Sequence, residues 1–288
     1  MSPNNKPPIE RPASWVTAAL VAGAIAAGFA APRGSAAGTP AAAAAAPAAV
    51  TPAASAPSCS APIDLVHLNY PLRRTARHLE RGEKLVIVAI GSSSTAGAGA
   101  SSPAASYPSR LAVELQQRFP GRDIVVLNRG VNGQESAQML ARFATDVVAA
   151  DPDLVLWQVG TNSVLRDHSL QAHAALLREG IAQLKQAGAD VVLMDMQYAP
   201  KVLEKPETAG MEDQIALTAK QESVDLFGRF ALMRDWHDVQ HIPFGTFVAP
   251  DRLHMNDWGY GCVAKLLAAA IGEATTRPVA SAAVRAEP

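Results

Sequence analysis

Four short runs of apolar residues recur along the chain, and within them apolar positions follow one another without regular polar alternation. The runs are 84–90 (KLVIVAI), 123–128 (DIVVLN), 153–159 (DLVLWQV) and 190–196 (DVVLMDM). Continuous runs rich in valine and isoleucine are typical of strands covered on both faces, as in a parallel sheet. The pattern therefore predicts four buried parallel strands.

Segments with helical spacing separate these runs. Leu111, Leu115 and Phe119 follow one another at four-residue spacing, and a Pro-Gly pair then ends the pattern. The predicted helices are 107–121, 136–152, 170–189, about 208–223 and 255–274, and 223–227 (SVDLF) is a candidate fifth strand. Alternating strands and helices predict a three-layer α/β domain, with a parallel sheet of about five strands and right-handed crossovers.

The N-terminal part has a different character. Lys6 and Arg11 precede an uncharged apolar stretch at 15–31, and small residues at Ser35 and Ala37 follow it. This order is typical of an export signal, with cleavage after Ala37. The apolar stretch is also close to the minimum length that crosses a bilayer. We therefore predict that 1–37 is a signal peptide or an uncleaved membrane anchor.

The rest of the chain divides into a linker, a domain and a tail. Residues 38–58 are rich in alanine and proline, uncharged and without apolar periodicity, which predicts a disordered, extended tether. Residues 59–275 are enough for one sizeable core and form the predicted folded domain. Residues 276–288 are expected to be a flexible tail.

Composition excludes some functions. With 25 Lys and Arg against 26 Asp and Glu, the chain has no basic patch of the kind that nucleic acid requires. No Cys or His pair has zinc spacing, so we expect no metal and no cofactor. Cys59 and Cys262 stand at opposite ends of the predicted domain. In an exported protein they are candidates for a disulfide; the alternative is two unrelated thiols.

Polar and small residues follow each predicted strand. These stretches are GSSSTAG (91–97), NRGVNG (128–133), GTNS (160–163) and QYAP (197–200), and DRLH (251–254) precedes the last helix. Each alone has an ordinary explanation: a turn, a helix cap or a local Asp–His hydrogen bond. Ligand sites in parallel sheets form beyond the carboxyl ends of the strands. The common placement of these stretches therefore favours one active site.

In these stretches and their order, the chain resembles the SGNH hydrolases, also called GDSL-type esterases and lipases. The first block of that family, Gly-Asp-Ser, matches 91–93, with Ser92 in place of the aspartate. The Gly-x-Asn-Asp block matches 160–163, with Ser163 in the last position, and Asp-x-x-His matches 251–254 without a gap. The resemblance covers 84–270 and implies a flavodoxin-like α/β/α sandwich.

The resemblance also implies a catalytic triad. Ser93 would be the nucleophile, His254 its general base, and Asp251 the carboxylate that orients the base, because a neutral hydroxyl needs such activation. Ser92 and Ser94 remain alternative nucleophiles. An α/β-hydrolase is a rival, but its Gly-x-Ser-x-Gly elbow needs glycine where this chain has threonine, and its histidine usually lies far beyond its acid.

The same resemblance implies an oxyanion hole. Its donors would be the backbone N–H groups of Ser93 and Gly130, the latter matching the glycine of the second block, and the side-chain amide of Asn162. Gln197 and Tyr198, after the fourth predicted strand, are candidates for the substrate pocket.

These features predict an exported serine esterase, periplasmic or secreted, that hydrolyses a short-chain ester, an acetyl ester, through an acyl-enzyme. Its substrate would be a small acyl ester or an acylated envelope or extracellular carbohydrate. We expect a monomer that meets a membrane only through an N-terminal anchor. Lipase, thioesterase or acyltransferase chemistry could use the same triad. A catalytically silent glycan-binding envelope protein is the alternative from another class, supported by the serine at position 92.

Overall fold

The computed structural model describes residues 57–277. The predicted segment 1–37, most of the predicted linker 38–58 and residues 278–288 lie outside this part. Within it, none of the helices combines the length and the apolar character needed to cross a membrane.

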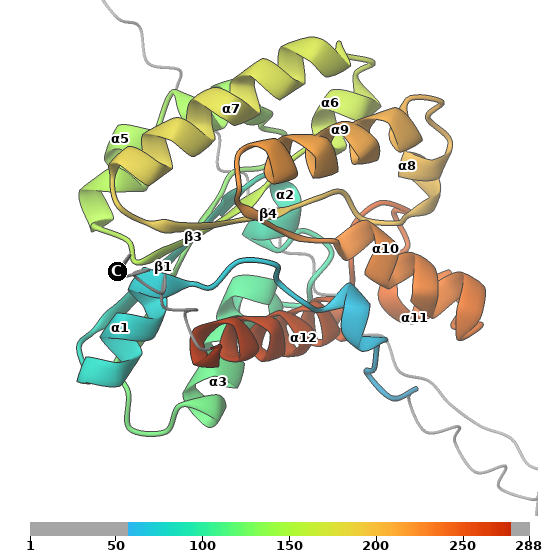
Figure 1. The fold of residues 1–288 in the computed structure, drawn as a ribbon. Helices are drawn as coiled ribbons and strands as arrows, with labels where there is room; N and C mark the ends of the chain where they lie inside the picture. Colours follow the sequence, from blue (N-terminus) through green and yellow to red (C-terminus); the bar gives the residue numbers. More distant parts are fainter. Residues whose placement is uncertain (1–56, 278–288) are drawn as a thin grey trace, which may run out of the picture. The chain divides into compact units, whose positions relative to one another are not determined.

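Five parallel strands form one sheet, in the order β2-β1-β3-β4-β5 (Figure 1). They are β1 (Leu85–Gly91), β2 (Ile124–Gly130), β3 (Leu154–Gln158), β4 (Asp190–Met194) and β5 (Asp225–Phe227). Helices cover both faces of this sheet, so the predicted three-layer α/β fold is confirmed. Because every pair of strands is parallel, all five carboxyl ends lie at the same edge.

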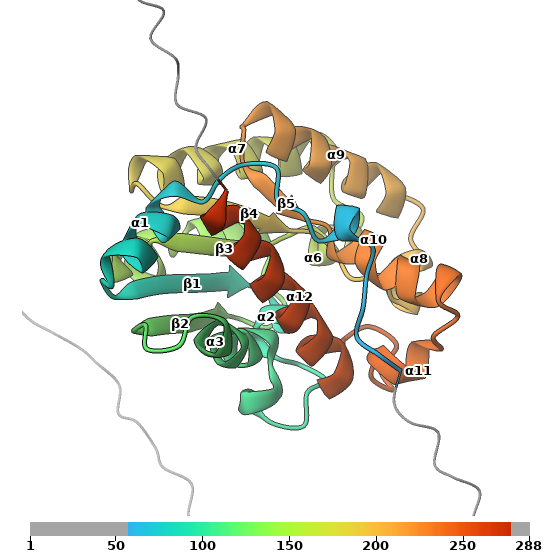
Figure 2. The ribbon, with the colours of Figure 1, turned by 60° about the horizontal axis from the view of Figure 1, so that its bottom comes forward.

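The longer helices and two short ones lie on the two faces of the sheet, and the remaining short helices lie in the connections (Figures 1 and 2). One face carries α1 (Arg73–Arg81), α3 (Tyr107–Arg118) and α12 (Asp257–Thr276). The other carries α4 (Ser136–Leu140), α5 (Phe143–Asp146), α7 (Leu170–Gln186) and α9 (Thr208–Gln221). The remaining short helices are α2 (Ser93–Ala96), α6 (Thr161–Leu165), α8 (Pro200–Leu203), α10 (Arg229–Arg234) and α11 (Phe244–Phe247). Single turns of other helix types lie at Ile63–Leu65, Pro103–Ala105, Val148–Ala150 and Asp235–Val239.

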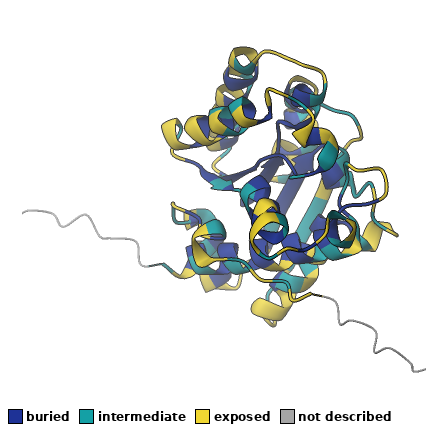
Figure 3. Ribbon diagram, turned by 90° about the vertical axis from the view of Figure 1, so that its right-hand side faces the viewer, coloured by how far each residue is buried: buried dark blue, intermediate teal, exposed yellow. Residues whose placement is uncertain are grey.

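Alternate residues of the strands supply two separate cores. In β1, Leu85 and Ile87 pack toward α1, α3 and α12, whereas Val88 and Ile90 pack toward α7 and its neighbours. Successive side chains of a strand point to opposite faces, so a strand covered on both faces is apolar throughout. Figure 3 accordingly shows most of the sheet coloured as buried.

The prediction of a single helix over 136–152 is wrong, because the chain forms α4, α5 and a 3-10 turn there. The break falls at Arg142, whose backbone leaves helical geometry with φ −116°. Its guanidinium donates to the carbonyl of Arg129 over 2.7 Å and pairs with Asp146 over 2.8 Å. The contact with Arg129 holds Arg142, where the helix is interrupted, against the end of β2.

A disulfide joins Cys59 to Cys262 in α12, across a sequence separation of 203. The segment after Cys59 is also held by Trp236, whose indole Nε1 donates to the carbonyl of Ser60 over 3.1 Å. Both contacts fix the start of the described chain against the domain.

Reduction of this disulfide should lower the free energy of unfolding by about 2–5 kcal/mol, because the bond restricts a long loop in the unfolded chain. Urea unfolding of the protein with and without reductant measures the difference. A Cys59→Ser/Cys262→Ser double variant is the control and should not respond to reductant. Equal unfolding midpoints for the oxidised and reduced protein would contradict the prediction.

Candidate active site

A tight turn at the end of β1 places Ser93 at the start of α2. Gly91 makes the turn feasible, because a Cβ there would lie 2.1 Å from Thr95 Oγ1 and 2.8 Å from Gln158 Oε1. Ser93 is therefore held at the carboxyl edge of the sheet, directly beyond the end of β1.

The three consecutive serines differ in their surroundings. Ser92 and Ser94 are 2% and 1% exposed. The N–H and Oγ of Ser92 donate to Gln158 Oε1 over 2.9 and 2.8 Å, and Ser94 Oγ donates inward to Gln197 Oε1 over 3.4 Å. Ser93 is half-buried, and its Oγ lies 2.8 Å from His254 Nε2. Of the three hydroxyls, that of Ser93 is the one directed at the histidine.

Asp251 holds the other side of the imidazole. Its Oδ2 lies 2.5 Å from His254 Nδ1, and its Oδ1 accepts the N–H groups of Leu253 and His254 over 2.9 and 3.0 Å. Burial opposes ionisation of Asp251, but the hydrogen bonds from His254 and Leu253 outweigh it and hold the pKa of this carboxyl below its usual value. An ionised Asp251 accepts the Nδ1 proton, which leaves Nε2 free to accept the proton of Ser93.

Asp251 and His254 lie in the loop 248–255, which we call the triad loop. It is closed at its base and supported by contacts with other segments. Val248 and Met255 form an antiparallel bridge across it. Arg252, at its tip, has φ +63°, in the left-handed region that costs energy for residues other than glycine. Its carbonyl accepts the N–H of Lys201 over 3.1 Å, and its guanidinium pairs with Glu204 over 2.6 Å. The segment after β4 thus packs against the triad loop.

Asn162 lies in α6, beside the turn that follows β2. Its Nδ2 donates to the carbonyl of Gln134 over 2.9 Å. This bond leaves the second N–H of the amide group available, because Nδ2 carries two hydrogens.

Gly130 does not fit the role predicted for it. Its N–H already donates to Asn128 Oδ1 over 2.9 Å, so it is not free to bind an oxyanion. The glycine is needed for another reason: a Cβ at this position would lie 2.1 Å from the backbone nitrogen of Ala96. Gly130 therefore allows β2 to approach α2 closely.

Gly133, the second glycine of the same stretch, was not singled out in the sequence. It has φ +76°, and its carbonyl accepts from Arg166 Nη2 over 2.9 Å. Its N–H has no hydrogen-bond acceptor among residues 57–277. Its immediate neighbour is Gln134, whose carbonyl holds Asn162. The only signal in the sequence is that NRGVNG contains two glycines.

The two predicted pocket residues have other surroundings. Gln197 is only 1% exposed, so the prediction that it lines an open pocket is wrong. Tyr198 is half-buried, packs edge-on against Phe230 and stacks on Phe244, and its hydroxyl donates to Asp238 over 3.0 Å. Its contacts are those of a residue that stabilises the fold.

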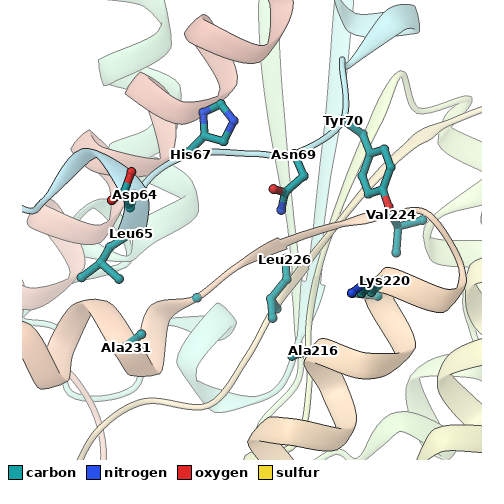
Figure 4. Close-up of a pocket in the computed structure, with 12 residues that line it drawn as sticks. Asp64, Leu65, His67, Asn69, Tyr70, Ala216, Lys220, Val224, Leu226 and Ala231 are labelled. Atoms are coloured by element: carbon teal, nitrogen blue, oxygen red, sulfur yellow. The ribbon is translucent and has the colours of Figure 1, made fainter.

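The cavity shown in Figure 4 does not belong to this site. Its volume is about 610 Å³, and its lining residues come from the segment 64–70 and from the region of α9, β5 and α10. Ser93, Asp251 and His254 are not among them. In the part of the chain that the structure describes, no group of three or more His, Cys, Asp or Glu side chains could hold a metal ion.

Comparison with known proteins identifies the family. The model of the Non-GDSL lipase-like family matches residues 58–277. The chain belongs to this family. The predicted relationship to the SGNH hydrolases is thereby confirmed for nearly the whole described region.

Several proteins with similar sequences or folds are named as esterases. An arylesterase of Vibrio mimicus is 33% identical over 95 residues, which is 33% of this chain and 46% of the arylesterase. An acetylxylan esterase of Geobacillus stearothermophilus is 26% identical over 169 residues, 55% of this chain and 77% of that protein. A two-domain esterase (CEX) active on acetylated mannans has the same fold, with a TM-score of 0.60 at 21% identity over 77% of this chain. The chain spans about half of the arylesterase and 58% of the two-domain esterase.

Proposed function

We propose that this protein is an exported serine esterase that removes a short acyl group, an acetyl group, from a carbohydrate. One observation carries the proposal: an unbroken chain of contacts runs from Ser93 Oγ to His254 Nε2 over 2.8 Å, and from His254 Nδ1 to Asp251 over 2.5 Å. This is the arrangement that activates a serine hydroxyl for acyl transfer.

The reaction proceeds in two halves. Ser93 Oγ attacks the ester carbonyl as its proton passes to His254 Nε2, and Asp251 stabilises the imidazolium that forms. The tetrahedral intermediate collapses, and the departing alcohol takes the proton from Nε2, leaving an acyl group on Ser93. Water then attacks the acyl carbonyl as His254 takes its proton. The bond to Ser93 Oγ breaks, the carboxylic acid leaves, and His254 returns the proton to Ser93 Oγ.

The oxyanion formed in each half needs fixed donors. We assign this role to the N–H groups of Ser93 and Gly133 and to the side-chain amide of Asn162. Ser93 is the first residue of α2, so its N–H has no acceptor within the helix. Arg166 supports the turn of Gly133, because its guanidinium binds the carbonyl of Gly133 and the carboxylate of Glu135.

Asn162→Ala should lower kcat by about 10²–10³-fold with a much smaller change in KM, because it removes a donor that acts mainly in the transition state. Initial rates with p-nitrophenyl acetate measure both constants. Thermal unfolding of the variant is the control, since the amide also holds Gln134 O. A kcat within about threefold of the wild type would remove Asn162 from the oxyanion hole.

The substrate and the location rest on further observations. Two of the similar proteins act on acetylated polysaccharides by name, an acetylxylan esterase and an esterase active on acetylated mannans. The disulfide between Cys59 and Cys262 supports export, because such bonds persist in oxidising compartments. The signal-like 1–37 segment points the same way. We propose a periplasmic or secreted monomer, held to a membrane only if that segment stays uncleaved.

Labelling with a fluorophosphonate, followed by mass spectrometry of the modified peptide, tests the enzyme proposal. The expected result is a single adduct on Ser93 that is absent in His254→Ala. An adduct on Ser92 or Ser94 would keep the enzyme and change the nucleophile. No adduct on the folded protein would contradict the esterase and favour the glycan-binding alternative.

Esters of increasing chain length then test the acyl specificity. Acetyl esters should react faster than butyryl or octanoyl esters, and an added sugar should not become acylated. Preference for the long chain would indicate a lipase or thioesterase, and an acylated sugar would indicate an acyltransferase.

A further inference from the structure

A buried glutamine lies beneath the proposed active site. Gln197 follows β4 and is 1% exposed. Its Oε1 accepts from Thr161 Oγ1 over 2.9 Å, Arg229 Nη2 over 3.0 Å and Ser94 Oγ over 3.4 Å. Its Nε2 donates to the carbonyl of Leu253 over 3.2 Å. One amide group thus connects four segments that are distant in the sequence.

Three of these partners are sequence neighbours of proposed active-site residues. Ser94 follows the nucleophile, Thr161 precedes the residue that supplies the side-chain oxyanion donor, and Leu253 precedes the base. The segments α2, α6 and the triad loop arise from separate parts of the chain, and the geometry of the reaction depends on their relative positions. The amide of Gln197 contacts all three.

Arg229 fixes which way this amide points. It is fully buried, and its Nη2 also donates to the carbonyl of Asp195 over 2.6 Å. A guanidinium group has donors and no acceptor, so the oxygen of Gln197 must face it. The nitrogen of the amide then faces Leu253. If the amide were turned over, its NH₂ group would face the N–H groups of Arg229 and its oxygen would face the carbonyl oxygen of Leu253.

We propose that Gln197 is a positioning residue, whose N–H holds the triad loop at the correct distance from α2. This inference rests on the proposed esterase function. The competing explanation is that Gln197 only satisfies Arg229, whose Nε and Nη1 have no hydrogen-bond partner among the described residues. The two explanations separate because they depend on opposite ends of the same amide group.

The decisive variants are Gln197→Glu and Gln197→Met. Glutamate keeps the shape of the side chain and offers acceptors to Arg229 and Thr161, but it cannot donate to Leu253 when ionised. Methionine removes both functions. Gln214→Glu is the matched control, because Gln214 pairs with His173 and Thr218 rather than with any segment of the site.

Both Gln197 variants should lower kcat by about 10- to 100-fold with KM within about twofold, since small displacements of catalytic groups have effects of this size. Gln214→Glu should keep the wild-type kcat. If Gln197→Glu retains kcat within about twofold while Gln197→Met loses it, Gln197 serves Arg229 and the proposal is overturned. Thermal unfolding checks that the variants fold. If Gln197→Met does not fold, the comparison of kcat between Gln197→Glu and Gln214→Glu still decides.

A second readout separates this inference from the esterase proposal. If the wild type reacts with fluorophosphonate and Gln197→Glu reacts at the same rate, the inference fails and the esterase stands. If the wild type does not react, the esterase fails, and the NMR signals of the His254 ring still report on the loop. Changed chemical shifts of that ring in both Gln197 variants, absent in Gln214→Glu, support the positioning role; unchanged chemical shifts in Gln197→Met overturn it.

Discussion

Ser93→Ala should lower kcat by roughly 10⁵–10⁶-fold, the loss typical when the nucleophile of a serine triad is removed. The physical reason is that Ser93 Oγ, 2.8 Å from His254 Nε2, is the only one of the three serine hydroxyls directed at the base. Alanine removes the attacking atom and leaves the turn intact. Initial rates with p-nitrophenyl acetate at high enzyme concentration measure the residual activity.

The neighbouring serines provide the matched controls. Ser92→Ala loses the contact between its hydroxyl and Gln158 but keeps the one from its backbone N–H, and Ser94→Ala loses a long contact to Gln197. Neither removes an atom that touches His254, so each should keep kcat within about tenfold of the wild type while its stability falls by about 1 kcal/mol. If Ser93→Ala retained activity comparable to either control, the assignment of the nucleophile would be wrong.

Asp251→Asn should lower kcat by about 10⁴-fold while the protein stays folded. The asparagine oxygen can still accept the N–H groups of Leu253 and His254, which preserves the turn. Its NH₂ group, however, would face His254 Nδ1 and favour the tautomer with the proton on Nε2. That tautomer cannot accept the proton of Ser93. Steady-state kinetics and thermal unfolding together distinguish this effect from unfolding.

The pH dependence of the wild type follows from the same pair. Because the pKa of Asp251 lies below its usual value of about 3.9, the carboxylate is ionised at every pH above about 4. Its contribution to stability is present above that range and is lost only as pH falls through the lowered pKa. If activity is already lost at a pH above about 4, a group other than Asp251 must be responsible.

A kcat for Asp251→Asn within about tenfold of the wild type would show that Asp251 does not orient the imidazole.

The strands were predictable because their signal is local. A strand buried on both faces is apolar over most of its length, and β1, β3 and β4 stand out for that reason. Helix α1 was not predicted, since only Thr75 and Leu79 of it are buried and the rest, apart from Ala76, is charged or polar. The break at Arg142 was also hidden, because its cause is a contact with Arg129 in another element.

The candidate site was predictable where one short motif supplies the residues that contact each other. Asp251 and His254 are three apart, so their contact depends on one short turn. The sequence could not distinguish Gly130 from Gly133, because the difference is which N–H is occupied, and the side chain of Asn128 determines that. The sequence places Gln197 at the correct edge of the sheet, but it does not show that the side chain is buried. Its burial depends on Arg229 and Leu253, which are distant in the sequence.

The disulfide has a mechanical consequence. A force applied between the two ends of the described chain would travel through the covalent bond from Cys59 to Cys262 rather than through the intervening residues. The sheet, the nucleophile and the triad loop all lie between these two cysteines in the sequence. Stretching would therefore extend only the few residues before Cys59 and the part of α12 after Cys262. The covalent path through residues 60–261 would therefore stay slack until the bond was reduced.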